Sequence, residues 1–295
     1  MIRALCFAAA LAAPLACAAA APIAITNPSF EDISGESPFN EFTFGPLNGW
    51  DLYDPNNVTN GGAGSTFYIG TLTPFEPDPV GAPGVYANFP AGAADGQRVG
   101  IAFNFVGSDG IGEYGYQQTL TDQLIAFRQY TLRVEVGNIA SATAMSGQFF
   151  DLDGFPGYRV ELRAGANLIA QDDNTLAGSI PEGAFATSAV ALSTNGSTVG
   201  LGEPLSIRLI NLNQLDPTDP GADLEVDFDH VRLDVVNPCP GDADGSGAVD
   251  LADLNLVLFN FGAAVLPGAN GDVDGSGQVD LADLNVVLFN FGAVC

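Results

Sequence analysis

Between residues 22 and 236, apolar residues occur in short runs that are separated by turns rich in Gly, Pro, Asn and Asp. In two of these runs, YTLRVEV and YRVEL, apolar and polar residues alternate, which is typical of a strand with one buried face. The pattern predicts strands at residues 23–26, 49–53, 65–69, 98–104, 114–120, 130–138, 157–163, 185–192, 205–211 and 224–235. This many strands, without a convincing amphipathic helix, favour an all-β sandwich of the jelly-roll type.

The pattern changes after residue 237, where the chain repeats itself. Residues 241–262 (GDADGSGAVDLADLNLVLFNFG) and 271–292 (GDVDGSGQVDLADLNVVLFNFG) differ at three positions and are 30 residues apart. Each copy joins an Asp- and Gly-rich loop to an apolar run that is long enough for one short helix. Residues 237–295 are therefore predicted to form a small helical module, which unfolds separately from a sandwich domain at 22–236.

Each copy carries a twelve-residue loop with the ligand pattern of an EF-hand. Ca²⁺ takes oxygen ligands, and here oxygen side chains stand at loop positions 1, 3, 5, 9 and 12, while position 7 offers its backbone carbonyl. The predicted ligands are Asp242, Asp244, Ser246, Ala248, Asp250 and Asp253 in the first loop and Asp272, Asp274, Ser276, Gln278, Asp280 and Asp283 in the second. The sequence therefore predicts two calcium ions in this module.

The doublet resembles a type I dockerin over residues 239–295. The resemblance rests on two loop–helix units that lack an entering helix and that have Asp, rather than Glu, at position 12. It implies docking onto a cohesin-like module or another surface or scaffold protein, as in assemblies that degrade polysaccharides. The chain departs from the family at loop positions 10 and 11, where Leu and Ala replace the usual Ser or Thr.

Composition narrows the range of partners. The chain has 295 residues with 35 acidic and 8 basic side chains, all of them Arg, and a formal net charge of −27. This balance excludes nucleic acid and anionic membrane surfaces as partners, and it favours cations. Residues 1–21 resemble a secretory signal peptide, and no later apolar stretch is long enough for a transmembrane helix. We therefore expect a secreted, extracellular or cell-surface protein.

Export to an oxidising environment would allow the cysteines to form a disulfide. After removal of the signal peptide the chain keeps Cys239 and Cys295. An even pair in an exported protein favours a disulfide, which here would clasp the C-terminal module. Two free thiols or an intermolecular bridge are the alternatives.

The sandwich domain resembles the galactose-binding-like jelly rolls that include many carbohydrate-binding modules. The resemblance rests on NPSFE at 27–31, GW at 49–50 and VDFDHVRL at 226–233. It implies that the first and last strands are adjacent and that Glu31 and Asp229 share a structural calcium ion. If they do not, these carboxylates are exposed strand ends.

A narrower resemblance is to the calcium-dependent Stig cyclases of indole alkaloid pathways. The matching stretches are DGQRV at 95–99, QQTL at 117–120, residues 130–138, GYRVEL at 157–162 and FDHVRL at 228–233. Those enzymes use an acidic residue on the same jelly roll to promote rearrangement and cyclisation. Asp227 or Asp229 is the nearest acid in this sequence.

The other candidate residues are aromatic. Sugar-binding sandwiches stack pyranose rings on exposed aromatic side chains, so Tyr114 and Tyr116, with Gln117 beside them, are candidate ligand-binding residues. A second aromatic group, at 149–158, is an alternative, and core packing is the competing explanation for both. Trp50 is expected in the core. The single histidine, His230, lies in a predicted strand, which argues against a Ser-His-Asp triad.

Taken together, the sequence favours a secreted, calcium-binding, dockerin-type protein. Its sandwich is expected to bind carbohydrate, in polysaccharide binding or degradation or in cell-surface assembly. The alternatives are a jelly-roll enzyme, either a glycan hydrolase or lyase or a Stig-cyclase-like enzyme, and a purely structural surface or matrix protein. Acidic residues are too frequent to identify a catalytic pair from sequence, so no catalytic residue is assigned.

Overall fold

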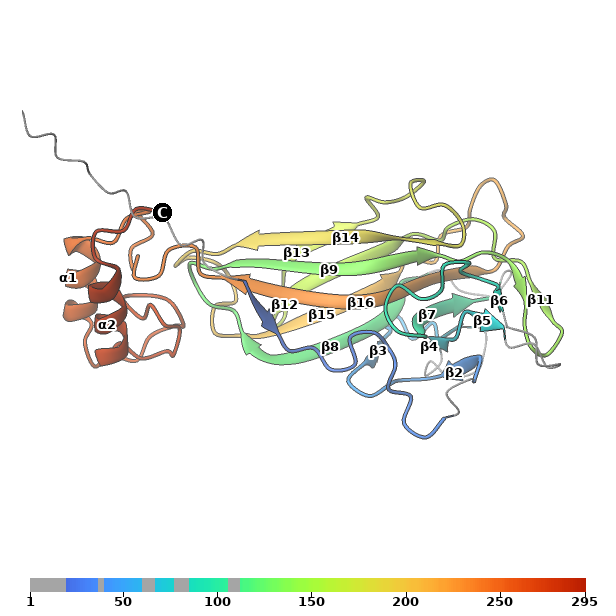
Figure 1. Ribbon diagram of the computed structural model, residues 1–295, viewed down its shortest axis with the longest axis horizontal. Helices are drawn as coiled ribbons and strands as arrows, with labels where there is room; N and C mark the ends of the chain where they lie inside the picture. Colours follow the sequence, from blue (N-terminus) through green and yellow to red (C-terminus); the bar gives the residue numbers. More distant parts are fainter. Residues whose placement is uncertain (1–19, 37–39, 60–66, 77–84, 106–111) are drawn as a thin grey trace, which may run out of the picture.

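The computed structural model describes residues 20–36, 40–59, 67–76, 85–105 and 112–295. Within these ranges, two β-sheets form a sandwich, and a module with two short helices lies beside one end of it (Figure 1). Most of the predicted signal peptide, residues 1–19, lies outside the described ranges. Neither helix has the length and apolar character that a membrane crossing requires.

The first sheet has seven strands and contains the last strand of the sandwich near its centre. In spatial order they are β14 (Ala184–Ser193), β9 (Gln129–Asn138), β16 (Leu224–Val236), β7 (Val99–Asn104), β4 (Phe67–Leu72) and β2 (Phe42–Phe44), with β1 (Ala21–Ile23) also paired to β16. The β1–β16 pair is antiparallel, with Ala21 opposite Val235. The first and last strands are therefore adjacent, as the resemblance to galactose-binding-like jelly rolls implied.

The second sheet has five strands and forms the other layer of the sandwich. In spatial order they are β13 (Asn167–Asp173), β12 (Tyr158–Ala164), β15 (Pro204–Asn211), β8 (Tyr114–Gln123) and β3 (Asp51–Tyr53). Two small hairpins complete the described strands: β5 (Phe75–Glu76) with β6 (Val85–Tyr86), and β10 (Ala142–Thr143) with β11 (Phe149–Phe150).

Each predicted strand region overlaps an observed strand, so the jelly-roll prediction is confirmed. The prediction misses the edge strand β13, the three-residue strand β2 and the two-residue strands of the small hairpins. In β13, three adjacent apolar residues are followed by polar ones, and its alternating burial is weak. An edge strand buries little of either face, so it leaves little hydrophobic periodicity in the sequence.

The core between the sheets is rich in aromatic residues. Trp50 is fully buried, its ring lies against Phe30 at 5.4 Å, and its Nε1 donates to the carbonyl of Asn27 at 2.9 Å. The expectation that Trp50 lies in the core is therefore confirmed. Tyr116 is also fully buried, and its hydroxyl accepts a hydrogen bond from the Gly70 N–H at 3.0 Å and donates to the carbonyl of Ile101 at 2.6 Å. This hydroxyl links the two sheets.

Replacing Tyr116 with Phe should destabilise the sandwich by about 1–3 kcal/mol, because it leaves buried backbone groups of the opposite sheet without their partner. Urea unfolding followed by the fluorescence of Trp50, the single tryptophan of the chain, measures this loss. Tyr53→Phe is the control, since Tyr53 is partly exposed and bonds to the Glu113 side chain. Equal midpoints for the Tyr116→Phe protein and the wild type would contradict the prediction.

The first sheet is covered on its outer face as well as on its core face. All six residues of β7 are buried, although one-sided burial would leave alternate residues exposed. Val99, Ile101 and Phe103 belong to a second hydrophobic cluster, which also contains Phe89 and Leu152 from the connecting loops. These loops cover the outer face of the sheet, and the candidate site lies between the loops and the sheet.

The C-terminal module (residues 239–295) is built from the two repeats. Its helices are α1 (Leu251–Phe259) and α2 (Leu281–Asn290). Each helix begins at a loop aspartate, Asp250 or Asp280, whose side chain accepts a hydrogen bond from the helix N-terminus. Val249 and Val279 pack in a common core and pair through backbone hydrogen bonds with the segment after the opposite helix. The predicted paired loop–helix arrangement is present in the structure.

Candidate functional site

A pocket lies on the outer face of the first sheet. Its walls come from β2, β4, β7 and β16 and from the hairpin β10–β11, and its cavity volume of about 10 Å³ has room for one water molecule, so a larger ligand requires the loops around it to open. The lining is mainly aromatic and aliphatic: Phe42, Tyr68, Leu72, Phe103, Ile139, Ala142, Ala144, Phe150 and Leu152, with Glu41, Asn88 and Glu225 as polar members. An apolar pocket with a few polar groups is the usual form of a small-molecule site.

Glu225 on β16 is the acid in the floor of this pocket. It is 3 % exposed and pairs across the sheet with Phe103 of β7. Its Oε1 is buried and has no hydrogen-bond partner among the described residues. Because a buried carboxylate oxygen without a partner is unfavourable, this atom is a candidate for contact with a bound molecule.

The pocket favours the protonated form of Glu225. Burial raises the pKa of Glu225 to about 8, against a hydrogen bond with the Asp227 carboxyl group that lowers it, and the negative charge of Asp223 raises it further. Burial and the negative charges of Glu225 and Asp223 also raise the pKa of the Tyr68 phenol well above its ordinary value. No basic side chain lines the pocket in the described part of the chain. At neutral pH the site therefore presents two proton donors among aromatic rings.

The acids expected from the cyclase resemblance lie further along the same strand. Glu225, Asp227 and Asp229 alternate on β16, so their side chains share one face of the sheet. Asp227 is fully buried, and its pKa is raised by burial, by the negative charge of Glu225 and by a hydrogen bond with the Glu225 carboxyl group. Neither Asp227 nor Asp229 lines the pocket. Sequence reasoning missed Glu225, although the alternation of three acids in a mostly apolar strand was visible.

Asp229 and Glu31 both accept hydrogen bonds from the turn at residues 95–98, although they lie in different parts of the chain. Asp229 accepts a hydrogen bond from the Asp95 N–H at 2.7 Å, while Glu31 accepts from the N–H groups of Gln97 and Arg98, both at 2.7 Å. Burial raises the pKa of Asp229 to about 7. The two predicted calcium ligands therefore approach one turn, and both serve as acceptors for its backbone.

The predicted carbohydrate-contacting residues are not arranged for that role. Tyr114 and Tyr116 are fully buried between the sheets, so neither ring can stack on a sugar at the surface. Gln117 points to the other face of β8 and donates to the carbonyl of Leu52 at 3.3 Å. The spacing placed both tyrosines correctly on one strand face, but that face is the core. Of the second aromatic group, Phe150 does line the pocket.

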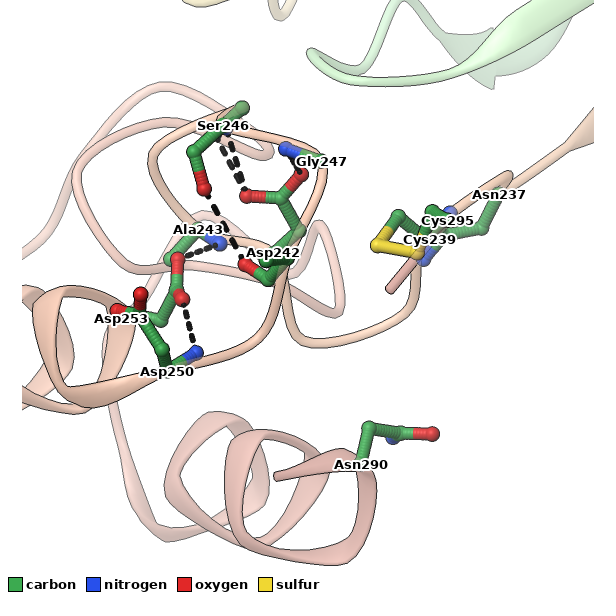
Figure 2. Close-up of a disulfide and its surroundings, with 12 residues drawn as sticks. Asn237, Cys239, Asp242, Ala243, Ser246, Gly247, Asp250, Asp253, Asn290 and Cys295 are labelled. Carbon is green, nitrogen blue, oxygen red and sulfur yellow. Dashed lines mark hydrogen bonds between the residues drawn. A yellow bond between two sulfur atoms is a disulfide. The ribbon is translucent and has the colours of Figure 1, made fainter. Parts of the chain in front are cut away.

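The two loops of the C-terminal module each bring three carboxylates together. Oxygens of Asp242, Asp244 and Asp253 lie within 4.8 Å of one another, and so do those of Asp272, Asp274 and Asp283. Figure 2 shows Asp242 inside the first loop, where its carboxylate accepts hydrogen bonds from the N–H groups of Ser246 and Gly247 at 3.0 and 2.8 Å. Burial raises the pKa of both Asp242 and Asp272, because charged groups are held away from water.

The disulfide prediction is confirmed. Cys239 and Cys295 are bonded, and they join the two ends of the module beside the first loop (Figure 2). Cys295 also donates its backbone N–H to the carbonyl of Gly247, at position 6 of that loop, at 2.9 Å. The disulfide therefore fixes the C-terminus against the first loop.

Comparison with known proteins assigns the sandwich. A family model, HpiC1-like, described as HpiC1 cyclase, matches residues 21–234. A Stig cyclase from Fischerella sp. TAU, in complex with (3Z)-3-(1-methyl-2-pyrrolidinylidene)-3H-indole, is 32% identical with a TM-score of 0.59, and the match covers 74% of this chain and 98% of that one. The same values, with 73% and 97% coverage, hold for a Fischerella cyclase in complex with 4-(1H-indol-3-yl)butan-2-one. No curated protein sequence matches the chain.

Carbohydrate-binding modules are far more distant. The CBM22-1 xylan-binding domain of Paenibacillus barcinonensis Xyn10C is 12% identical with a TM-score of 0.34, over 70% of this chain and 91% of that one. This likeness gives no support to carbohydrate binding, and the comparisons favour the cyclase alternative over it. The matched region covers the sandwich and ends before the C-terminal repeats. The chain belongs to the HpiC1 cyclase family.

Proposed function

We propose that the sandwich domain catalyses an acid-promoted rearrangement and cyclisation of an indole-bearing substrate, with Glu225 as the general acid. The observation that carries this proposal is a buried carboxyl group with a raised pKa in the floor of an aromatic pocket. Family membership and the indole ligands of the Fischerella cyclases support the choice of substrate class.

The pocket suits this chemistry in two ways. A protonated Glu225 donates its proton to the substrate, and the carboxylate that remains is close to the positive charge that develops there. The rings of Tyr68, Phe103 and Phe150 line the same space and favour a cation through their π-faces. The apolar walls also keep water away from a reactive cation.

Binding of 4-(1H-indol-3-yl)butan-2-one to the full chain tests the pocket, and turnover of the substrate of the Fischerella cyclase tests the reaction. Ala142→Phe places a ring in the pocket and should abolish binding in a calorimetric titration. Ala189→Phe, on the exposed face of β14, is the matched control and should bind like the wild type. Equal binding by both variants would rule out this pocket as the site.

The rate should depend on pH through the acid. Since Glu225 must carry a proton and its pKa is raised to about 8, kcat/KM should be constant below that value and fall as the pH rises through it. The stability that protonation contributes has the same sign: it is fully present below the unfolded-state pKa and is lost as the pH rises toward about 8. A pH profile of kcat/KM measures the inflection. A rate that instead falls on acidification through pH 5 would require an ionised base.

We further propose that the C-terminal module binds two calcium ions. The support is its donor set, because each loop gathers three carboxylates within 4.8 Å and the position-12 residues Asp253 and Asp283 are fully buried. Carboxylate and carbonyl oxygens in such a loop are the ligands that Ca²⁺ prefers. A bound cation would also offset the burial of these charges. Calorimetric titration of the full chain with Ca²⁺ tests this role, and a flat titration would refute it.

A further inference from the structure

One end of the sandwich contacts the C-terminal module through residues 124–128, which join β8 to β9 and are called the docking loop below. Figure 1 shows the module beside this end of the sandwich. In the docking loop, Ala126 donates its N–H to the carbonyl of Pro267 at 3.0 Å. Gly268 lies so close that a Cβ added to it would be 2.7 Å from the Ala126 nitrogen. The two backbones are therefore in direct contact.

The docking loop reaches both cation loops at equivalent positions. Gly245 and Gly275 are residue 4 of the first and second loop. A Cβ at Gly245 would lie 2.5 Å from Cε1 of Phe127, and a Cβ at Gly275 would lie 2.9 Å from Cδ1 of Ile125. Two side chains of one short loop thus pack on the related glycines of the two repeats.

The backbone of the docking loop is strained in this position. Phe127 has a φ of 52°, in the left-handed region that is unfavourable for a side chain of this kind. Such a conformation persists only where its surroundings hold it. The ring of Phe127 packs both on the sandwich core and on Gly245, so the module is part of those surroundings.

Arg128 adds an electrostatic contact to the second loop. Its Nη2 donates at 2.9 Å to the carbonyl of Val273, which lies between the predicted ligands Asp272 and Asp274. Nη1 donates to the carbonyl of Phe127 at 3.2 Å, which holds the guanidinium in place. The C-terminal module has eight Asp and no basic residue of its own. Arg128 therefore supplies the second loop with a positive charge from the sandwich.

We propose that the docking loop couples the two cation loops to the sandwich, so that calcium bound by the module stabilises the cyclase-family domain. The inference rests on the proposed calcium binding. If the docking loop fits the loaded loops better than the empty ones, cation binding strengthens docking and docking strengthens cation binding by the same factor. The interface thus argues against the expectation that the two halves unfold separately.

The single tryptophan gives a selective readout, because Trp50 is buried in the sandwich and the module has none. Thermal unfolding of the full chain is followed by Trp50 fluorescence in Ca²⁺ and in EDTA. In the wild type, Ca²⁺ should raise the midpoint of thermal unfolding by about 2–4 °C, which is the shift expected when a domain of this size gains modest stability. Calorimetry on the same protein counts the bound calcium ions.

The test variant is the double substitution Phe127→Asn and Arg128→Gln. Asn accepts the left-handed backbone, so the docking loop keeps its shape while the ring and the guanidinium are removed. The variant should keep two calcium sites but lose the calcium-dependent rise; its midpoint in EDTA should be lower than that of the wild type, because the Phe127 ring also packs on the sandwich core. Arg128→Gln alone, a milder change, should lose part of it. The matched control is Phe44→Asn with Arg133→Gln, outside the docking loop; it removes the contact of Phe44 with Tyr68 and the ion pair of Arg133 with Asp234, which lowers the midpoint in both buffers, but it should keep the calcium-dependent rise.

The outcomes separate the two proposals. Two calcium sites with a midpoint rise that disappears only in the test variant support coupling through the docking loop. Two calcium sites with no rise in the wild type, or with an unchanged rise in the test variant, overturn the coupling and leave calcium binding standing. The absence of calcium sites in the wild type overturns both.

Discussion

Replacing Glu225 with Gln should lower kcat by about 10²- to 10⁴-fold, the usual contribution of a positioned general acid. The side chain keeps its shape, and the amide is uncharged like the protonated acid that the pocket favours. We therefore expect an intact fold with binding of 4-(1H-indol-3-yl)butan-2-one retained. Steady-state turnover of the Fischerella cyclase substrate, together with Trp50-monitored unfolding, measures both properties. The effect should appear in kcat rather than in KM.

Two comparisons sharpen this result. Glu203→Gln, at an exposed position near the docking loop, makes the same chemical change away from the pocket and should leave turnover unchanged. Asp227→Asn removes the next acid on β16, which does not line the pocket; its loss in kcat should be smaller than that of Glu225→Gln, and it should shift the pH profile, because the Asp227 carboxyl group is hydrogen-bonded to Glu225. If Glu225→Gln turned over substrate at the wild-type rate, another group would have to deliver the proton.

Local sequence patterns predicted the strands of the sandwich well, and the resemblance to Stig cyclases directed attention to Asp227 and Asp229 on β16, but Glu225 was missed. The sequence did not show which part of the outer face of β16 is covered by loops. Glu225 is in a pocket because Phe89, Ile139, Leu152 and the hairpin β10–β11 cover the outer face of the sheet. These contacts come from loops that lie far from β16 in the sequence. The choice between Glu225, Asp227 and Asp229 therefore required the tertiary structure.

The tyrosines of β8 also show that a local pattern does not reveal which face of a strand is buried. Alternation places Tyr114 and Tyr116 on one side of the strand, but it does not say whether that side faces solvent or the second sheet. A polar hydroxyl made an exposed role plausible. In the structure, the Tyr116 hydroxyl is satisfied by backbone groups of β4 and β7, so the residue is buried without an unpaired polar group.

The C-terminal module was the part that the sequence predicted most directly, since a loop of twelve residues fixes its geometry through local hydrogen bonds. Asp253 illustrates this, because it accepts from the Ala243 N–H at 2.7 Å and from the Asp250 N–H at 2.7 Å within one repeat. The contact of the module with residues 124–128 had no such local signal. The pattern of the cation loop is enough to explain why glycine occurs at 245 and 275. The sequence therefore gave no sign that these glycines also pack against Phe127 and Ile125 of the docking loop.

Asp283→Asn should reduce the calcium stoichiometry of the full chain from two to one. Asp283 is fully buried at position 12 of the second loop, where its Oδ2 accepts the Asp280 N–H at 2.8 Å and caps α2. An amide keeps the size of the side chain but removes one of the charges that attract Ca²⁺. At a calcium concentration 100 times Kd, the lost site removes about 2.7 kcal/mol of stabilisation. Calorimetry gives the stoichiometry, and helical circular dichroism follows unfolding of the module.

The near-identity of the repeats provides the internal control. Asp253→Asn makes the same change in the first loop and should also leave one site, while the double variant should leave none. Asp51→Asn, an exposed acid in β3, should keep both sites. If the Asp283→Asn protein still bound two ions, the aspartate at position 12 would not be a ligand. Loss of both sites in each single variant would contradict the prediction and show that the two loops fold as one unit through the core that Val249 and Val279 share.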